Sequence, residues 1–156
     1  MEVNCLPVGI CSWNYELSGS GLEARTSLSM MGESGGVSVN GRAFSINKSG
    51  VLAPKWLMEE GSQVIAEASS ESLLTRAMVI FSGADRYVLS ASSAFGREFE
   101  LAGKNAQVRY TPSHMFTRRA VMSGQCERAE LAVFGFWLAA LSWKRSQNNS
   151  ASSSSN

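Results

Sequence analysis

The sequence predicts a mainly β protein: an antiparallel β-barrel of short strands that encloses one C-terminal hydrophobic α-helix. Glycines separate short segments rich in β-branched and aromatic residues, and an uncharged apolar segment, Leu131–Trp143, follows them. With 156 residues, 44% of them hydrophobic and 17% charged, the chain has the size and composition of one globular domain. We expect an N-terminal arm at 1–11, a single domain at 12–145 and a disordered Ser/Asn tail at 146–156.

The predicted strands are short and are separated by turns about every ten residues, which favours a closed or nearly closed all-β structure over a parallel sheet. In chain order they are Trp13–Leu17, Leu22–Met30, Gly36–Val39, Arg42–Ile46, Val51–Met58, Gln63–Ala68, Leu74–Phe81, Tyr87–Ala91, Arg97–Ala102, Asn105–Tyr110 and Met115–Met122. A further hairpin turn is expected at Gly83–Asp85.

The clearest predicted hairpin turn is Asn40–Gly41, since Asn-Gly is preferred where both residues of a two-residue loop need positive φ. This loop pairs Val39 with Arg42 and Val37 with Phe44.

A second two-residue loop is predicted at Gly103–Lys104, and it pairs apolar residues on one face and polar residues on the other. The predicted pairs are Leu101 with Ala106, Phe99 with Val108, Glu100 with Gln107 and Glu98 with Arg109. A shift of one residue would bury the glutamates, so the alternation indicates the inward face.

The period then changes to that of a helix, which we expect over residues 130–145. Glu127 and Glu130 suit the positive end of a helix dipole, and Lys144 and Arg145 suit the negative end. The uncharged stretch Leu131–Trp143 is about 20 Å long as a helix, whereas a bilayer core of roughly 30 Å needs about 20 residues. We therefore expect the helix to be buried in the protein.

One side of this helix is bulky and the other is small. Phe134, Trp137, Leu138 and Leu141 are expected to fill the core. Small residues on the other side, Gly135 among them, would let the helix lie close to the sheet.

This organisation, from Trp13 to Arg145, resembles the tubby-like superfamily of tubby C-terminal domains, LURP-one-related proteins and phospholipid scramblases. The segments that support the resemblance are Tyr87–Leu89, Arg97–Leu101, Phe116–Arg119, Phe136–Leu138 and Trp143–Arg145, which look like those of uncharacterised bacterial members. The resemblance implies a β-barrel around a central helix. This chain lacks the concentrated basic patch with which tubby domains bind phosphoinositides, so the resemblance implies no particular ligand.

Lysines and arginines number 14 against 13 acidic residues, so no overall charge attracts the chain to nucleic acid and we expect no nucleic-acid partner. Local recognition of anionic phospholipid is still open, through a modest basic patch of Arg118, Arg119, Lys144 and Arg145. A protein partner is the other option.

The three cysteines have no metal-ligand spacing, which favours free thiols. The chain also starts without a secretory signal, so we expect a cytoplasmic protein, with membrane association as a further expectation.

No motif predicts catalysis, a cofactor or a metal site. Ser34 lies in a G-x-S-x-G sequence, yet a predicted hairpin follows it and the only histidine, His114, lies downstream. Cys126 precedes the helix without an adjacent base, and Glu59–Glu60 fits a solvated turn.

The leading interpretation is a non-enzymatic β-barrel acting as a lipid- or membrane-associated binding module. The alternatives are a small membrane protein anchored by Leu131–Trp143 and a hydrolase that uses Ser34.

Overall fold

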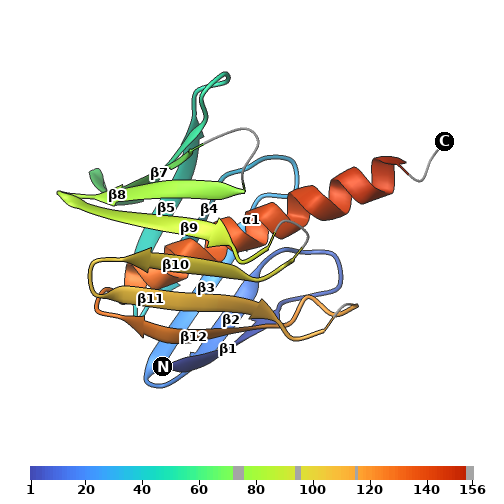
Figure 1. The fold of residues 1–156 in the computed structure, drawn as a ribbon, viewed down its shortest axis with the longest axis horizontal. Helices are drawn as coiled ribbons and strands as arrows, with labels where there is room; N and C mark the ends of the chain where they lie inside the picture. Colours follow the sequence, from blue (N-terminus) through green and yellow to red (C-terminus); the bar gives the residue numbers. More distant parts are fainter. Residues whose placement is uncertain (72–75, 94–95, 115, 154–156) are drawn as a thin grey trace.

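The computed structural model describes residues 1–71, 76–93, 96–114 and 116–153 (Figure 1). These residues form twelve β-strands and one α-helix: β1 (Glu2–Pro7), β2 (Tyr15–Gly19), β3 (Leu22–Leu28), β4 (Gly35–Val39), β5 (Arg42–Ser49), β6 (Lys55–Glu60), β7 (Gln63–Ser70), β8 (Ala77–Ser82), β9 (Asp85–Ala91), β10 (Phe99–Gly103), β11 (Ala106–Pro112), β12 (Ala120–Cys126) and α1 (Ala129–Ser153). The strands form a closed antiparallel barrel that encloses the first part of α1, where the buried residues run from Leu131 to Lys144, and the rest of the helix projects from the barrel. The predicted fold class is confirmed.

Each strand pairs with its sequence neighbours, and β1 pairs with β12 to close the barrel. Among the described strands, closure therefore leaves no edge exposed for pairing with another chain. In β3, four alternate residues starting at Leu22 are buried and the three between them are exposed. This two-residue period follows from the strand pleat and directs one face of every strand at the helix.

The hairpin at Asn40–Gly41 has the predicted register. Val37 pairs with Phe44 and Val39 with Arg42. The φ angles of Asn40 and Gly41 are 48° and 85°, the positive values that this type of loop requires. The turn predicted at Gly83–Asp85 is also present, with Ser82 paired to Asp85 across it.

The register predicted for the β10–β11 hairpin is wrong by two residues. The loop is Lys104–Asn105, and Leu101 pairs with Val108 while Phe99 pairs with Tyr110. Asn105 takes the positive φ of 52°. Gly103 stays in the strand, where a Cβ would lie 2.4 Å from the Tyr87 ring on β9. A shift of two residues preserves the inward face, so the buried side chains are still the apolar ones.

The expectation that residues 1–11 form an arm is corrected, because Glu2–Pro7 is the strand that closes the barrel. Val3 and Cys5 are fully buried, and Pro7 ends the strand opposite Tyr15. A proline at the end of a strand leaves the ladder intact, and this is why it does not interrupt β1.

Three other strand starts differ from the prediction by three residues or more. Residues 50–54 form a loop with Val51 and Leu52 94% and 97% exposed, so β6 begins at Lys55. The predicted starts at Leu74 and Met115 lie outside the described residues, and the strands there begin at Ala77 and Ala120.

Helix α1 continues past the predicted end at Arg145 to Ser153, so the expectation of a disordered tail is corrected over 146–153. A helix anchored by packing propagates more easily than it nucleates. Within this extension, the hydroxyls of Ser150 and Ser152 donate to carbonyls four residues earlier, at 3.0 and 3.1 Å. Residues 154–156 lie outside the described residues.

The bulky helix residues fill the barrel as the sequence suggests. Phe134, Trp137, Leu138 and Leu141 are at most 1% exposed. The Tyr110 hydroxyl donates to the carbonyl of Ala132 at 2.8 Å and so fastens the barrel wall to the helix.

The polar groups of the buried tryptophans of α1 find partners in the barrel wall. The indole N–H of Trp137 donates to the Ser27 carbonyl at 2.8 Å, and that of Trp143 donates to the Arg97 carbonyl at 2.7 Å. These bonds fix the rotation of the helix within the barrel.

Candidate anion-binding site

The antiparallel meander places alternate connections at opposite ends of the barrel. The short turns at 20–21, 40–41 and 83–84 lie at the end where the helix begins. The connections β1–β2, β3–β4, β5–β6, β7–β8, β9–β10 and β11–β12 lie at the other end, which we call the exit end because α1 leaves the barrel there (Figure 1). Segments far apart in sequence therefore meet at the exit end.

Positive charge that is not neutralised by carboxylates gathers at the exit end. Nine of the described lysines and arginines form ion pairs with a carboxylate. The described cations outside these pairs include Arg76, Arg118, Arg119 and Lys144, and all four are at the exit end. A protein with nearly zero net charge thus has a locally positive surface.

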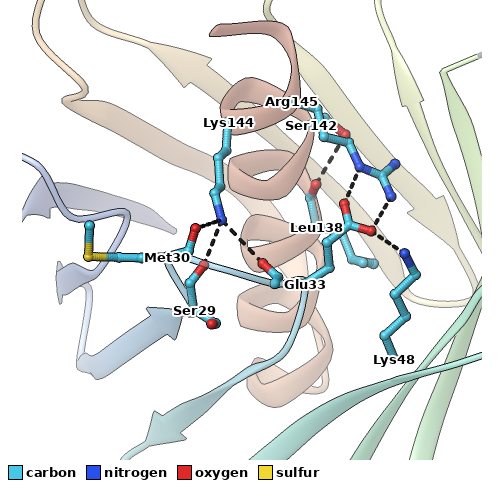
Figure 2. A network of polar contacts seen from close by, with 9 residues as sticks. Ser29, Met30, Glu33, Lys48, Leu138, Ser142, Lys144 and Arg145 are labelled. Carbon is cyan, nitrogen blue, oxygen red and sulfur yellow. Dashed lines mark hydrogen bonds and ion pairs between the residues drawn. The ribbon is translucent and has the colours of Figure 1, made fainter. Parts of the chain in front are cut away.

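Lys144, predicted as a ligand-binding cation, is instead 9% exposed and holds the β3–β4 loop. Its ammonium donates to the carbonyls of Ser29, Met30 and Gly32 at 2.6, 3.3 and 3.2 Å (Figure 2). These three bonds use all the donors that a lysine has. Lys144 is therefore a structural residue.

Arg145 is likewise committed to the same loop. Its guanidinium donates through Nε and Nη2 to the two carboxylate oxygens of Glu33, and the Lys48 ammonium donates to Glu33 at 2.6 Å (Figure 2). These hydrogen bonds, from Arg145 first and then Lys48, lower the pKa of Glu33 to about 2. The Arg145 guanidinium also lies 5.2 Å from the centre of the buried Trp56 ring.

Arg118 and Arg119 lie at a separate place, so the predicted patch of four cations is divided in two. The guanidinium of Arg118 donates to the carbonyls of Gly9, Ile10 and Ser12 in the β1–β2 loop. It also lies 5.3 Å from the ring centre of Trp13. Arg119 is exposed.

These two arginines line an open pocket of about 1020 Å³ beside the emerging helix. Two more arginines, Arg76 and Arg97, line it as well. The other lining residues are apolar, small or uncharged polar: Pro7, Ile10, Cys11, Trp13, Phe116, Thr117, Trp143, Ser146, Gln147, Asn148 and Ser150. The described lining thus contains four arginines and no aspartate or glutamate.

Arg76 and Arg97 were not among the predicted site residues. Arg76 donates through Nη2 to the carbonyls of Ser93 and Gly96 and lies 5.3 Å from the ring centre of Phe99. Both arginines flank connections at the exit end. Counting alternate connections of the meander would have placed them near Arg118, since β7–β8, β9–β10 and β11–β12 all turn at that end.

The chemistry of this pocket suits an anion with an apolar neighbour. Guanidinium groups bind phosphate and carboxylate oxygens through paired N–H donors and stay charged at any physiological pH. Arg76 and Arg118 donate to main-chain carbonyls, which leaves their positive charge uncompensated. We call these four arginines and their lining the arginine pocket.

The other predicted candidates lie elsewhere. Ser34 is in the β3–β4 loop, and among the hydrogen bonds of the described residues none joins it to His114. The ring of His114 accepts the N–H of Phe116 at 3.1 Å. Glu60 is held by two guanidinium N–H donors of Arg42 in an exposed pair.

The three cysteines are free thiols. Burial raises the pKa of Cys126, which opposes activation by the helix start. Burial also raises the pKa of Cys5 to about 12. No cluster of three His, Cys, Asp or Glu side chains that could hold a metal occurs in the described part of the chain.

Comparisons with protein-family models, curated proteins and solved structures found no match. The resemblance to the tubby-like superfamily therefore stays a prediction. Within the described residues, no helix has both the length and the apolar character needed to cross a bilayer. The residues of the proposed anchor, Leu131–Trp143, lie inside the barrel, with the partly exposed Ser142 among them.

Proposed function

We propose that this protein is a non-enzymatic binding module whose arginine pocket binds the phosphate of an anionic phospholipid. The observation that supports this most is the meeting of four arginines and no carboxylate in the described lining of one open pocket. In ordinary surfaces, cations and anions are interspersed, as they are over the rest of this barrel. A pocket lined by positive charge attracts negatively charged ligands.

The arrangement of the arginines supports a division of roles. Arg118 and Arg76 hold the loops that form the walls, because each donates to loop carbonyls. Arg119 is exposed at the pocket, where its guanidinium can reach a ligand. The proposed phosphate therefore meets the exposed Arg119 guanidinium beside Arg76 and Arg118, whose charges keep the rim positive.

The fold agrees with the proposed kinship. An antiparallel barrel closed around a C-terminal helix is the arrangement that the tubby-like resemblance implies, and we propose that relationship on the same grounds. The resemblance does not supply the ligand, which we infer from the pocket alone.

Flotation with lipid vesicles tests the proposal. The protein should float with vesicles containing phosphatidylserine and not with phosphatidylcholine alone, and added salt should weaken binding. Arg119→Gln should weaken binding about fivefold, since each cation near an anionic surface contributes on the order of 1 kcal/mol.

Arg25→Gln is the matched control. Arg25 is 77% exposed and paired with Glu16 on β2, away from the pocket lining. Its replacement should leave vesicle binding within about twofold of the wild type. Equal loss in both variants, or binding that ignores lipid charge, would refute the arginine pocket as the lipid site.

A further inference from the structure

Two of the most exposed apolar side chains of the protein flank the arginine pocket. Ile10 is 92% exposed and Phe116 is 89% exposed, and both line the pocket. Exposed apolar surface that is rimmed by polar residues is typical of sites that contact a protein or a membrane.

The two side chains come from neighbouring loops because β1 pairs with β12. Ile10 belongs to the β1–β2 loop and Phe116 to the β11–β12 loop. Pairing of the strands brings together residues that are more than one hundred positions apart in the sequence. The two loops form one edge of the exit end.

Hydrogen bonds hold the main chain of both tips. Arg118 donates to the carbonyls of Gly9, Ile10 and Ser12, which fixes the first loop. Phe116 is held through its N–H, which donates to the His114 ring, and the two ring centres lie 5.7 Å apart. The tips are therefore presented outward by polar anchors, which lowers the cost of ordering them on binding.

Resting on the proposed function, we propose that Ile10 and Phe116 insert among the lipids of an anionic bilayer when the arginine pocket binds. The pocket thus binds phospholipid within a membrane and not the free phosphate compound. Separate projecting tips suit a fluid surface, and the arginines that line the same pocket suit the lipid phosphates. The helix residues Ser146–Ser150 beside the pocket are uncharged, so contact with the headgroup layer removes no charged side chain of this segment from water.

Serine substitutions at the tips test this inference in the full-length protein. Ile10→Ser and Phe116→Ser should each weaken binding to phosphatidylserine vesicles about tenfold, because each removes most of the transfer free energy of one apolar side chain. Neither side chain is buried, so thermal unfolding should be unchanged. Binding to soluble glycerol phosphate should be much weaker than binding to vesicles.

Met31→Ser and Leu52→Ser are matched controls. Met31 and Leu52 are 98% and 97% exposed at the same end of the barrel, but neither lines the arginine pocket. Both variants should bind vesicles like the wild type.

A fluorescent label on Phe116→Cys, with Cys11→Ser removing the exposed thiol, should shift to the blue with vesicles, and a label on Met31→Cys should not. Unchanged vesicle binding by the tip variants, equal loss in the controls, or equally tight binding of glycerol phosphate would overturn the insertion. If Arg119→Gln still weakens binding in that case, the proposed function survives. If Arg119→Gln has no effect while the tip variants do, insertion survives and the arginine pocket does not.

Discussion

Gly135→Ala should destabilise the protein, although the same change in an exposed helix stabilises it by about 1 kcal/mol. A Cβ on Gly135 would lie 2.3 Å from the Tyr110 hydroxyl and 3.0 Å from its ring carbon Cζ. Tyr110 is fully buried and bonded to the carbonyl of Ala132 on the same helix, so its ring cannot retreat without losing that bond.

The magnitude follows from these terms. Overpacking a core by one methyl group costs about 1–3 kcal/mol, and leaving a buried hydroxyl without its partner costs about 1–3 kcal/mol. After subtraction of the helix-propensity gain of about 1 kcal/mol, Gly135→Ala should lower the free energy of unfolding by about 1–5 kcal/mol. Urea unfolding followed by tryptophan fluorescence, to which the buried Trp56, Trp137 and Trp143 contribute, measures this value.

A double-mutant cycle with Tyr110→Phe separates the clash from other effects. Tyr110→Phe alone should cost about 1 kcal/mol, since it removes one hydrogen bond. In that background the oxygen 2.3 Å from the new Cβ is absent, so Gly135→Ala should cost at least about 1 kcal/mol less than in the wild type. A stabilising Gly135→Ala, or strictly additive substitutions, would refute the close packing of helix against strand β11.

Two further predictions concern the β3–β4 region. Gly35→Ala should lower the free energy of unfolding in urea by more than about 3 kcal/mol, because its Cβ would overlap the Ser27 carbonyl oxygen. Gly32→Ala is the control and should be nearly neutral, since the nearest neighbouring atom lies 3.8 Å from its Cβ. Similar costs for both substitutions would contradict the packing. Glu33, whose pKa falls from 4.5 to about 2 on folding, binds protons more readily when unfolded, so its contribution of about 1–2 kcal/mol should be complete above pH 4.5 and fade towards pH 2. The difference in urea midpoint between the wild type and Glu33→Gln should shrink over that range, and a constant difference would argue against the ion-pair network.

Local patterns in the sequence determine much of the barrel. Alternation of apolar and polar residues shows which face of each strand points inward, because the pleat has a period of two. Asn40–Gly41 specifies its own loop, since both residues tolerate positive φ. The length and uniform apolarity of Leu131–Trp143 indicate a helix enclosed in the protein.

Only the tertiary structure decided features that depend on distant partners. Gly103 looks like a turn residue, but it lies in strand β10, where the ring of Tyr87 on the neighbouring strand leaves no room for a Cβ. The segment Glu2–Pro7 is a strand because it pairs with β12, which is the last strand in the sequence.

The candidate site shows the same division. The sequence indicates which residues are cations, but not whether carboxylates, carbonyls or solvent surround them. The Lys144 ammonium donates to carbonyls of residues more than one hundred positions away in the sequence. Arg76 and Arg97 line the same pocket as Arg118 because alternate connections of an antiparallel meander turn at one end of the barrel. Composition sets the charge of a side chain, and barrel closure decides what lies beside it.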